Sequence, residues 1–191
     1  CNRLLDDIYG IMQSGDKHFL GTIVFMAAKS GGFALREYII IDGQQRLTTL
    51  MLILKALSVV AESVGDDCYH EIEEQYLHNK YCDEEFKVKL KPIKSDNNQF
   101  LLLLEDKIDE MDEDTHIYHN FMLCKERFER WAEKGINPSH VLDALTKLEI
   151  VEIVLTKGED DPQVIFESIN STGLELSNAD LIRNYLLMNA D

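Results

Sequence analysis

The spacing of apolar residues divides the chain into helical and extended segments. In residues 2–13 the apolar positions fall three and four apart, which predicts an amphipathic helix ending at Gly15. Residues 18–26 and 35–41 are rich in β-branched and aromatic residues, and a glycine-containing segment, 27–34, separates them. We therefore expect one helix followed by two neighbouring strands.

A second helix is predicted directly after the second strand. Its apolar residues recur at intervals of three and four: Leu47, Leu50, Met51, Leu54 and Leu57. This stripe is typical of a core-facing helix, which we expect to reach about Val64 and to end at Gly65. Residues 66–147 are mainly helical in pattern, with a strand-like interruption at 86–93.

The last part of the chain returns to an extended pattern and then to helices. Residues 148–155 alternate and are β-branched, which predicts a strand. Asp161 is expected to cap a short helix over residues 162–170. Ser177, with an acidic residue three positions later, indicates the start of a final helix.

This order of elements predicts an α+β fold with a small mixed sheet and a large helical insertion. We expect residues 1–65 and 148–191 to form the two parts of the core, and residues 66–147 to form the insertion. We also expect the chain to be a fragment of a longer protein.

Composition narrows the classes of function. The chain has 191 residues, of which 45% are hydrophobic, so it can bury a sizeable core. No apolar run approaches the roughly 20 residues that span a bilayer, and the first residues lack the pattern of a secretory signal, so we expect a cytoplasmic protein. The formal charge of −16 argues against binding nucleic acid by charge alone. Four cysteines without metal-site spacing predict reduced, structural thiols.

The junction between the second strand and the following helix holds the most distinctive polar run, Asp42-Gly43-Gln44-Gln45-Arg46. The first amides of a helix and its dipole form a ready anion site. Arg46 adds a planar cation for phosphate oxygens, and Asp42 adds a carboxylate for a metal ion or its water. Gln44 or Gln45 has the chemistry to orient an attacking water. From these five residues alone a purely structural interpretation is favoured, in which Asp42 and Gln45 form a capping box.

Two motifs resemble one known family. The run IIDGQQRLTTL resembles the signature of the N-terminal domain of GmrSD-type restriction endonucleases, and FESINSTGLELSNADLIRNYLL is similar to the second hallmark of that family. HFLGTIVF is similar to its first core strand. The resemblance covers nearly the whole chain in the right order.

The resemblance implies a ParB/sulfiredoxin-like fold and a role in modification-dependent restriction and phage defence. It implies that Asp42, Gly43, Gln44, Gln45 and Arg46 line a site for a nucleoside triphosphate with Mg2+. By the same comparison Asn170, Gly173 and Arg183 would lie nearby. Sulfiredoxin chemistry is excluded, because this loop offers no cysteine nucleophile. Family members usually carry a further Pro…Gln-Arg segment upstream and a separate His-containing nuclease domain downstream.

Three other features have simpler explanations. Lys87, Lys89 and Lys91 alternate with apolar residues in residues 86–93, which favours a lysine-protected edge strand over a nucleic-acid surface. His116 and His119 share one helical face, where a solvated surface is favoured over a metal site, as it is for the acidic run 105–114. Trp131 is expected in the core of the insertion rather than as a base-stacking platform, because nearby positive charge is sparse.

The sequence thus predicts an NTP-binding and hydrolysing module of a restriction endonuclease that acts on modified or foreign DNA, with Asp42, Gln44 and Arg46 as catalytic residues. Its expected partners are a nucleoside triphosphate, DNA through the full-length protein, and a nuclease domain or subunit. One alternative is a non-catalytic nucleotide-sensing or structural module. Another, ranked last, is a domain that itself cuts DNA, because no carboxylate cluster with metal-site spacing is visible.

Overall fold

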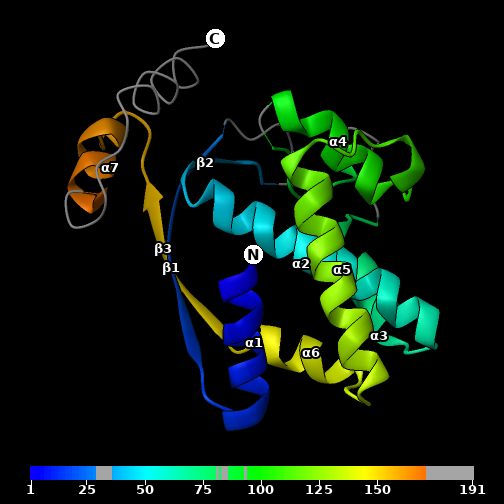
Figure 1. Ribbon diagram of the computed structural model, residues 1–191. Helices are drawn as coiled ribbons and strands as arrows, with labels where there is room; N and C mark the ends of the chain where they lie inside the picture. Colours follow the sequence, from blue (N-terminus) through cyan, green and yellow to red (C-terminus); the bar gives the residue numbers. More distant parts are fainter. Residues whose placement is uncertain (29–35, 81, 83–85, 93, 171–191) are drawn as a thin grey trace. The chain divides into compact units, whose positions relative to one another are not determined.

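The computed structural model describes residues 1–28, 36–80, 82, 86–92 and 94–170 (Figure 1). The chain divides into two compact units. The larger unit comprises residues 1–20 and 45–149, and the smaller unit comprises residues 21–44 and 150–191. The predicted final helix after Ser177 lies outside the described residues, as does most of the predicted loop 27–34. The predicted division at residues 65 and 147 stays a prediction.

The larger unit is a helical assembly around one apolar core. Its helices are α1 (Asn2–Ser14), α2 (Gln44–Val64), α3 (Cys68–Glu71), the π-helix η1 (Ile72–Leu77), α4 (Lys94–Leu104), the 3-10 helix η3 (Ile108–Glu110), α5 (His116–Glu133) and α6 (Pro138–Leu145). The largest fully buried apolar side chains of this core include Phe100, Phe121, Phe128, Leu5, Ile8 and Ile53. The burial of such side chains is the main favourable contribution to the stability of this unit.

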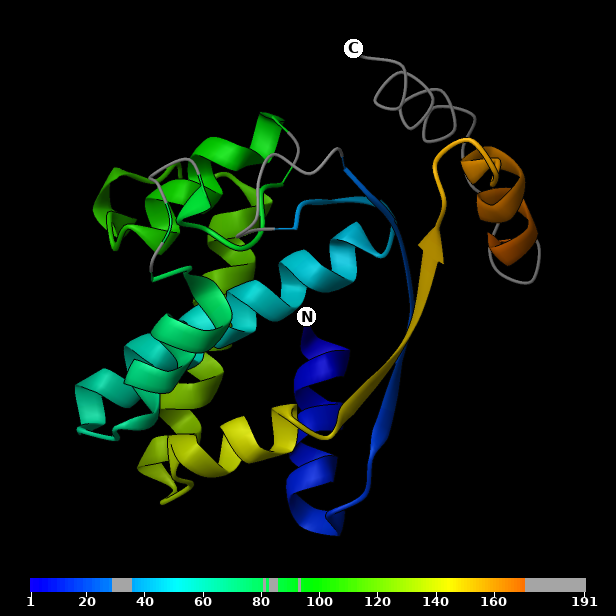
Figure 2. The same cartoon turned by 180° about the vertical axis from the view of Figure 1, so that it is seen from behind.

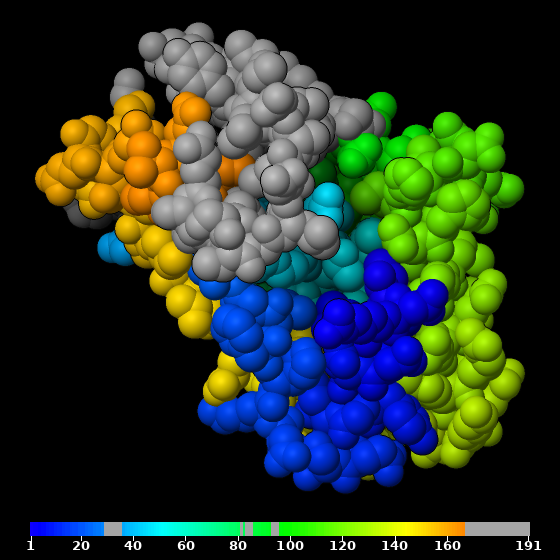
Figure 3. All heavy atoms as spheres, turned by 60° about the vertical axis from the view of Figure 1, so that its left-hand side comes forward, coloured from blue at the N-terminus to red at the C-terminus, as the bar shows by residue number. Residues whose placement is uncertain are grey.

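Helix α1 is held against α5 by both polar and aromatic contacts. Arg127 Nη1 donates to Asp6 Oδ1 over 2.8 Å, and the rings of Tyr9 and Trp131 lie 5.6 Å apart. The space-filling view shows the N-terminal helix lying along the helices that end the larger unit (Figure 3). Trp131 is 5% exposed, which confirms the prediction that it belongs to the core.

Helix α2 is buried on more than one face. Ten of its residues between Met51 and Ala61 are buried, so the predicted single stripe understates its burial. The expectation that no segment approaches bilayer length was also wrong. Within the described residues, this 21-residue helix is long and apolar enough to cross a membrane, a test that the core helices of soluble proteins also pass.

The buried face of α2 contains one charged side chain, Lys55, which is 1% exposed. Its ammonium lies 2.8 Å from Glu73 Oε1 on η1 and 2.8 Å from Asp106 Oδ1, which follows α4. Glu73 also accepts a hydrogen bond of 2.7 Å from Ser58 Oγ, and its other oxygen lies 3.2 Å from His78 Nδ1. A buried charge is tolerated only when it is paired, so this network fixes η1 and the α4 loop to α2.

The strand predicted over residues 86–93 was wrong. Within the described part of this segment, Val88 forms an isolated antiparallel bridge with His78 and no strand is assigned. The apolar and charged residues whose alternation suggested a strand still differ in burial. Val88 and Leu90 pack against the larger core, whereas the intervening lysines are exposed.

The smaller unit contains most of a three-stranded mixed sheet in the order β2-β1-β3. The strands are β1 (His18–Ala27), β2 (Tyr38–Asp42) and β3 (Leu148–Leu155), and β1 pairs antiparallel with β2. Helix α7 (Pro162–Asn170) covers the sheet with a small core of Val24, Ile41, Leu155 and Phe166 (Figure 1, Figure 2). The predicted α+β class is therefore confirmed.

Most element boundaries agree with the predictions from the sequence. Helix α1 ends at Gly15, whose φ of 77° is the left-handed conformation that glycine adopts at helix ends. Asp161 caps α7, because its Oδ1 accepts a hydrogen bond of 2.9 Å from Gln163 N. Strand β2 begins at Tyr38, later than the predicted start at residue 35, which lies outside the described residues.

We predict that acid weakens the larger unit through Glu73. Burial opposes the ionisation of this carboxyl, but the hydrogen bonds from His78, Lys55 and Ser58 outweigh it and lower its pKa from 4.5 to about 2. A carboxylate with a lowered folded-state pKa stabilises the fold above its unfolded pKa, and that stability is lost as the pH falls toward the folded pKa. From about pH 5 to about pH 2, Glu73 should account for a loss of about 3 kcal/mol in the free energy of unfolding, measurable by urea denaturation.

Two substitutions isolate this effect. Glu73→Gln should remove most of the acid dependence in that range, although the variant starts from a lower stability. Glu74→Gln changes the adjacent, exposed residue, which pairs with the exposed Lys80 at the surface, and it should keep most of the acid dependence of the wild type. Equal acid dependence of Glu73→Gln and wild type would contradict this assignment.

Candidate functional site

The polar run predicted as a site forms the turn from β2 into α2. Asp42 is the last residue of β2, Gly43 connects, and α2 begins at Gln44. Because α2 begins at Gln44, Gly43 directly precedes its first residue, and the capping box expected for Asp42 and Gln45 stays a prediction. The first amides of α2 follow directly after a buried glycine, which is the arrangement expected for a helix-start anion site.

Both the backbone conformation at position 43 and the small space beside it require a glycine. Its φ is +94°, a region that side chains rarely adopt. A Cβ at this position would stand 3.1 Å from Ile23 Cγ1 and 3.4 Å from the Thr22 carbonyl oxygen of β1. A side chain at this turn would therefore crowd β1.

A β-bulge shapes the end of the strand pair beside this turn. Val24 is opposite Asp42 and Phe25 is opposite Ile40, so the register shifts between two consecutive residues of β1. Bulges bend a strand and change the direction of the following residues. The shift thus sets the direction in which β2 delivers Asp42 to the turn.

The side chains of the run differ in exposure and in use. Gln44 Nε2 donates a hydrogen bond of 2.9 Å to the Ile40 carbonyl oxygen, so its amide nitrogen helps to hold the turn. Gln45 is exposed, whereas Asp42 and Arg46 are half-buried. The Gln44 amide oxygen takes no part in that bond, and Gln45 is the more accessible of the two glutamines.

The residues assigned by resemblance to the second motif lie at the edge of the described chain. Helix α7 ends at Asn170 and packs against β2, the strand that ends at Asp42. The description does not extend to the Asn170 side chain, and Gly173 and Arg183 lie outside the described residues. Their proximity to the turn stays a prediction.

No group of three His, Cys, Asp or Glu side chains converges as a metal site within the residues that the structure describes. A magnesium ion bound with a nucleotide needs fewer protein ligands, because one or two carboxylates and the phosphate oxygens complete its coordination with water. Asp42 fits that smaller requirement as a single carboxylate, and its role as the Mg2+ ligand stays a prediction.

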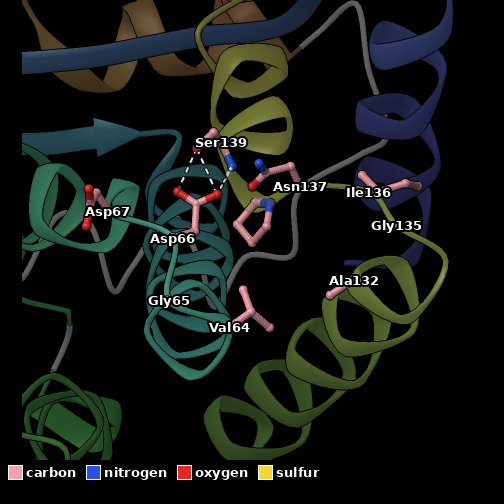
Figure 4. Close-up of a pocket in the computed structure, with 10 residues that line it drawn as sticks. Val64, Gly65, Asp66, Asp67, Ala132, Gly135, Ile136, Asn137 and Ser139 are labelled. Atoms are coloured by element: carbon pink, nitrogen blue, oxygen red, sulfur yellow. Dashed lines mark hydrogen bonds between the residues drawn. The ribbon is translucent and has the colours of Figure 1, made fainter.

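A second polar feature, missed from the sequence, lies in an open depression between the end of α2 and the start of α6 (Figure 4). Ser139 donates from its backbone nitrogen to Asp66 Oδ2 over 3.1 Å and from its hydroxyl to Asp66 Oδ1 over 2.6 Å. Burial opposes ionisation of Asp66, but the hydrogen bonds from Ser139 and Cys68 outweigh it and lower the pKa. This carboxylate joins two segments and has little capacity left for a ligand.

The buried thiols are structural, as predicted. Burial, followed by the neighbouring Asp66 carboxylate, raises the pKa of Cys68 to about 12. Burial raises the pKa of Cys124 to about 11. A thiol is a nucleophile or a metal ligand only as the thiolate, so neither residue is reactive at neutral pH.

The close approach of Gly43 to β1 predicts the cost of adding a side chain. Gly43→Ala should lower the free energy of unfolding by about 1–3 kcal/mol for the left-handed backbone alone. The contact with Ile23 should add about 1 kcal/mol. Thermal or urea denaturation of the chain measures the sum.

Gly65→Ala is the matched control. Gly65 also has a left-handed φ, +73°, but a Cβ there would meet nothing within 4 Å. Its substitution should cost only the backbone strain, about 1–2 kcal/mol. Equal costs at the two positions would show that the turn has room for a side chain, contrary to this description.

One known protein family matches nearly the whole chain. Its profile, described as "GmrSD restriction endonuclease, N-terminal domain", matches residues 1–187. No curated protein matches the chain. The matched region contains β1, β2, the turn at Gly43 and α7. The chain belongs to the family of GmrSD restriction endonuclease N-terminal domains and is therefore a module of a restriction and phage-defence system.

Proposed function

We propose that this chain binds and hydrolyses a nucleoside triphosphate at residues 42–46, as the cytoplasmic regulatory module of a restriction endonuclease. The observation that carries the proposal is the turn at Gly43. Its left-handed φ and its missing side chain bring a polar run to the start of α2, a helix of 21 residues. The unpaired amides at the start of a helix are natural donors to phosphate oxygens.

Each residue of the run has a chemical part in the proposed reaction. Arg46, one turn into α2, offers a guanidinium that grips phosphate oxygens and stabilises the negative charge that develops on them. Asp42 would hold Mg2+ through its carboxylate, and when bound the ion neutralises phosphate charge. A glutamine of the run orients the attacking water, with Gln44 through its Oε1 and Gln45 as the exposed neighbour.

The restriction context supplies the remaining partners of the proposal. A nuclease domain or subunit cleaves modified or foreign DNA, and nucleotide turnover in this module licenses that cleavage. Direct cleavage by the described residues has less support, because they contain no convergent carboxylate or histidine cluster.

One observation favours a second candidate function, a nucleotide-sensing module without turnover. The Gln44 amide nitrogen is committed to the Ile40 carbonyl oxygen within the turn. A glutamine that supports the backbone is restricted in how it follows an attacking water. In that case the turn would bind the nucleotide without hydrolysing it.

Phosphate release from each of the common nucleoside triphosphates, with and without DNA, separates these functions. The assay compares the wild-type restriction protein with Asp42→Ala and Arg46→Ala. We expect turnover by the wild type and a loss of about 100-fold in kcat for Arg46→Ala, because a positioned cation at the developing charge is removed. Asp42→Ala should raise the Mg2+ concentration needed for half-maximal activity.

Arg130→Ala is the control for the loss of an arginine, because Arg130 is an exposed residue of α5 whose Nε donates to the Glu126 carbonyl oxygen of its own helix over 3.1 Å. It should hydrolyse nucleotide like the wild type. Binding without turnover would establish the sensing function instead. Absence of nucleotide binding in the wild type would refute both functions.

A further inference from the structure

One aromatic side chain of α7 lies in a core with residues from all three strands. Phe166 is 4% exposed. It forms the small core under α7 with Val24 of β1, Ile41 of β2 and Leu155 of β3 (Figure 2). Helix α7 packs against β2, and Ile41 directly precedes Asp42 at the end of that strand. The core around Phe166 therefore ends one residue before the candidate site.

The bulge determines which face of the sheet carries Asp42. Val24 is opposite Asp42, and Phe25 is opposite Ile40. Ile41 is therefore the additional residue of β2. At a bulge, two successive residues of one strand oppose a single residue of the other, and residues that oppose each other share a face of the sheet. Ile41 and Asp42 thus share the face of Val24, which α7 covers, whereas successive residues of a regular strand face opposite sides.

The shared face joins a buried side chain to a polar residue of the site. Ile41 is 4% exposed in the core with Phe166, and Asp42, the next residue on the same face, is half-buried. Protein interiors are close-packed, so an apolar side chain that fills a small core restricts the backbone that carries it. The size of the Phe166 ring therefore restricts the position of the Asp42 carboxylate.

We propose that Phe166 is a positioning residue of the candidate nucleotide site and acts on the ligand through Ile41 and Asp42. The proposal rests on the function proposed for residues 42–46. It also gives a physical reason for the occurrence of two separate motifs in one chain. Ile41 belongs to the first motif, IIDGQQRLTTL, and Phe166 begins the second, FESINSTGLELSNADLIRNYLL.

A double-mutant cycle in nucleotide binding tests the proposal on the full-length restriction protein. The probes are fluorescent, non-hydrolysable analogues of ATP, GTP, CTP and UTP with Mg2+, and the analogue that the wild type binds most tightly is used. Phe166→Leu should weaken its binding by about 10-fold, which is within the range of couplings between residues in one packed group. In an Asp42→Ala background the same substitution should change binding by less than about 2-fold, because the positioned group is absent.

Two further variants separate positioning from a general loss of stability. Phe128→Leu makes the same chemical change in the core of the larger unit, where Phe128 is 2% exposed, and should bind the analogue like the wild type. Ile41→Val removes one methylene from the core under α7, so it should fold even if Phe166→Leu does not. It should weaken binding only when Asp42 is present.

The outcomes distinguish this proposal from the function on which it rests. Wild-type binding with unchanged binding by Phe166→Leu would overturn the role of Phe166 and leave the nucleotide site intact. Equal weakening by Phe166→Leu with and without Asp42 would also overturn it, because the effect would then not pass through that carboxylate. Failure of the wild type to bind any analogue would refute the nucleotide site, and the role of Phe166 with it.

Discussion

The larger unit depends on one buried positive charge. Lys55 lies in a helix that is otherwise packed by apolar side chains, and its ammonium is satisfied only because Glu73 and Asp106 approach it from two separate segments. Removal of one member of such a group leaves an uncompensated buried charge, which is far more costly than loss of an exposed pair. The position of α2, η1 and the loop after α4 is therefore one coupled arrangement. Through Glu73 the network reaches His78, which forms an antiparallel bridge with Val88.

Helix α2 combines a buried core segment with a polar first turn, two features that usually belong to different helices. From Met51 to Ala61 it is a core element, and its first turn is a polar run preceded by a glycine in a left-handed conformation. A helix fixed firmly along its length holds its first turn with little freedom. Rigid support of this kind is what a phosphate site built from backbone amides requires, because its donors must be in place before the ligand arrives.

Local patterns in the sequence were sufficient for most elements and insufficient for long-range pairing. The periodicity of α1 and the β-branched run of β3 act over neighbouring residues, so both elements were predicted closely. Residues 86–91 have the alternation of a strand, but a strand also needs a partner of matching length, and Val88 forms an isolated bridge with His78, just after η1. Lys55 and Asp66 have partners 18 and 73 residues away, which no local pattern indicates. At the candidate site the run itself was recognised, whereas the register shift that leaves Ile41 of β2 without an opposite residue in β1 depends on the pairing of the two strands.

The central claim is that the first turn of α2 receives the phosphates of a nucleotide. Amide hydrogen exchange with and without a non-hydrolysable nucleoside triphosphate analogue and Mg2+ measures this at the atoms concerned. The account predicts slower exchange at the amides of residues 44–46, an effect lost in Arg46→Ala, and no change near Val64 at the other end of the helix. Unchanged exchange at residues 44–46 under saturating analogue would contradict the claim, even if protection appeared elsewhere in the chain.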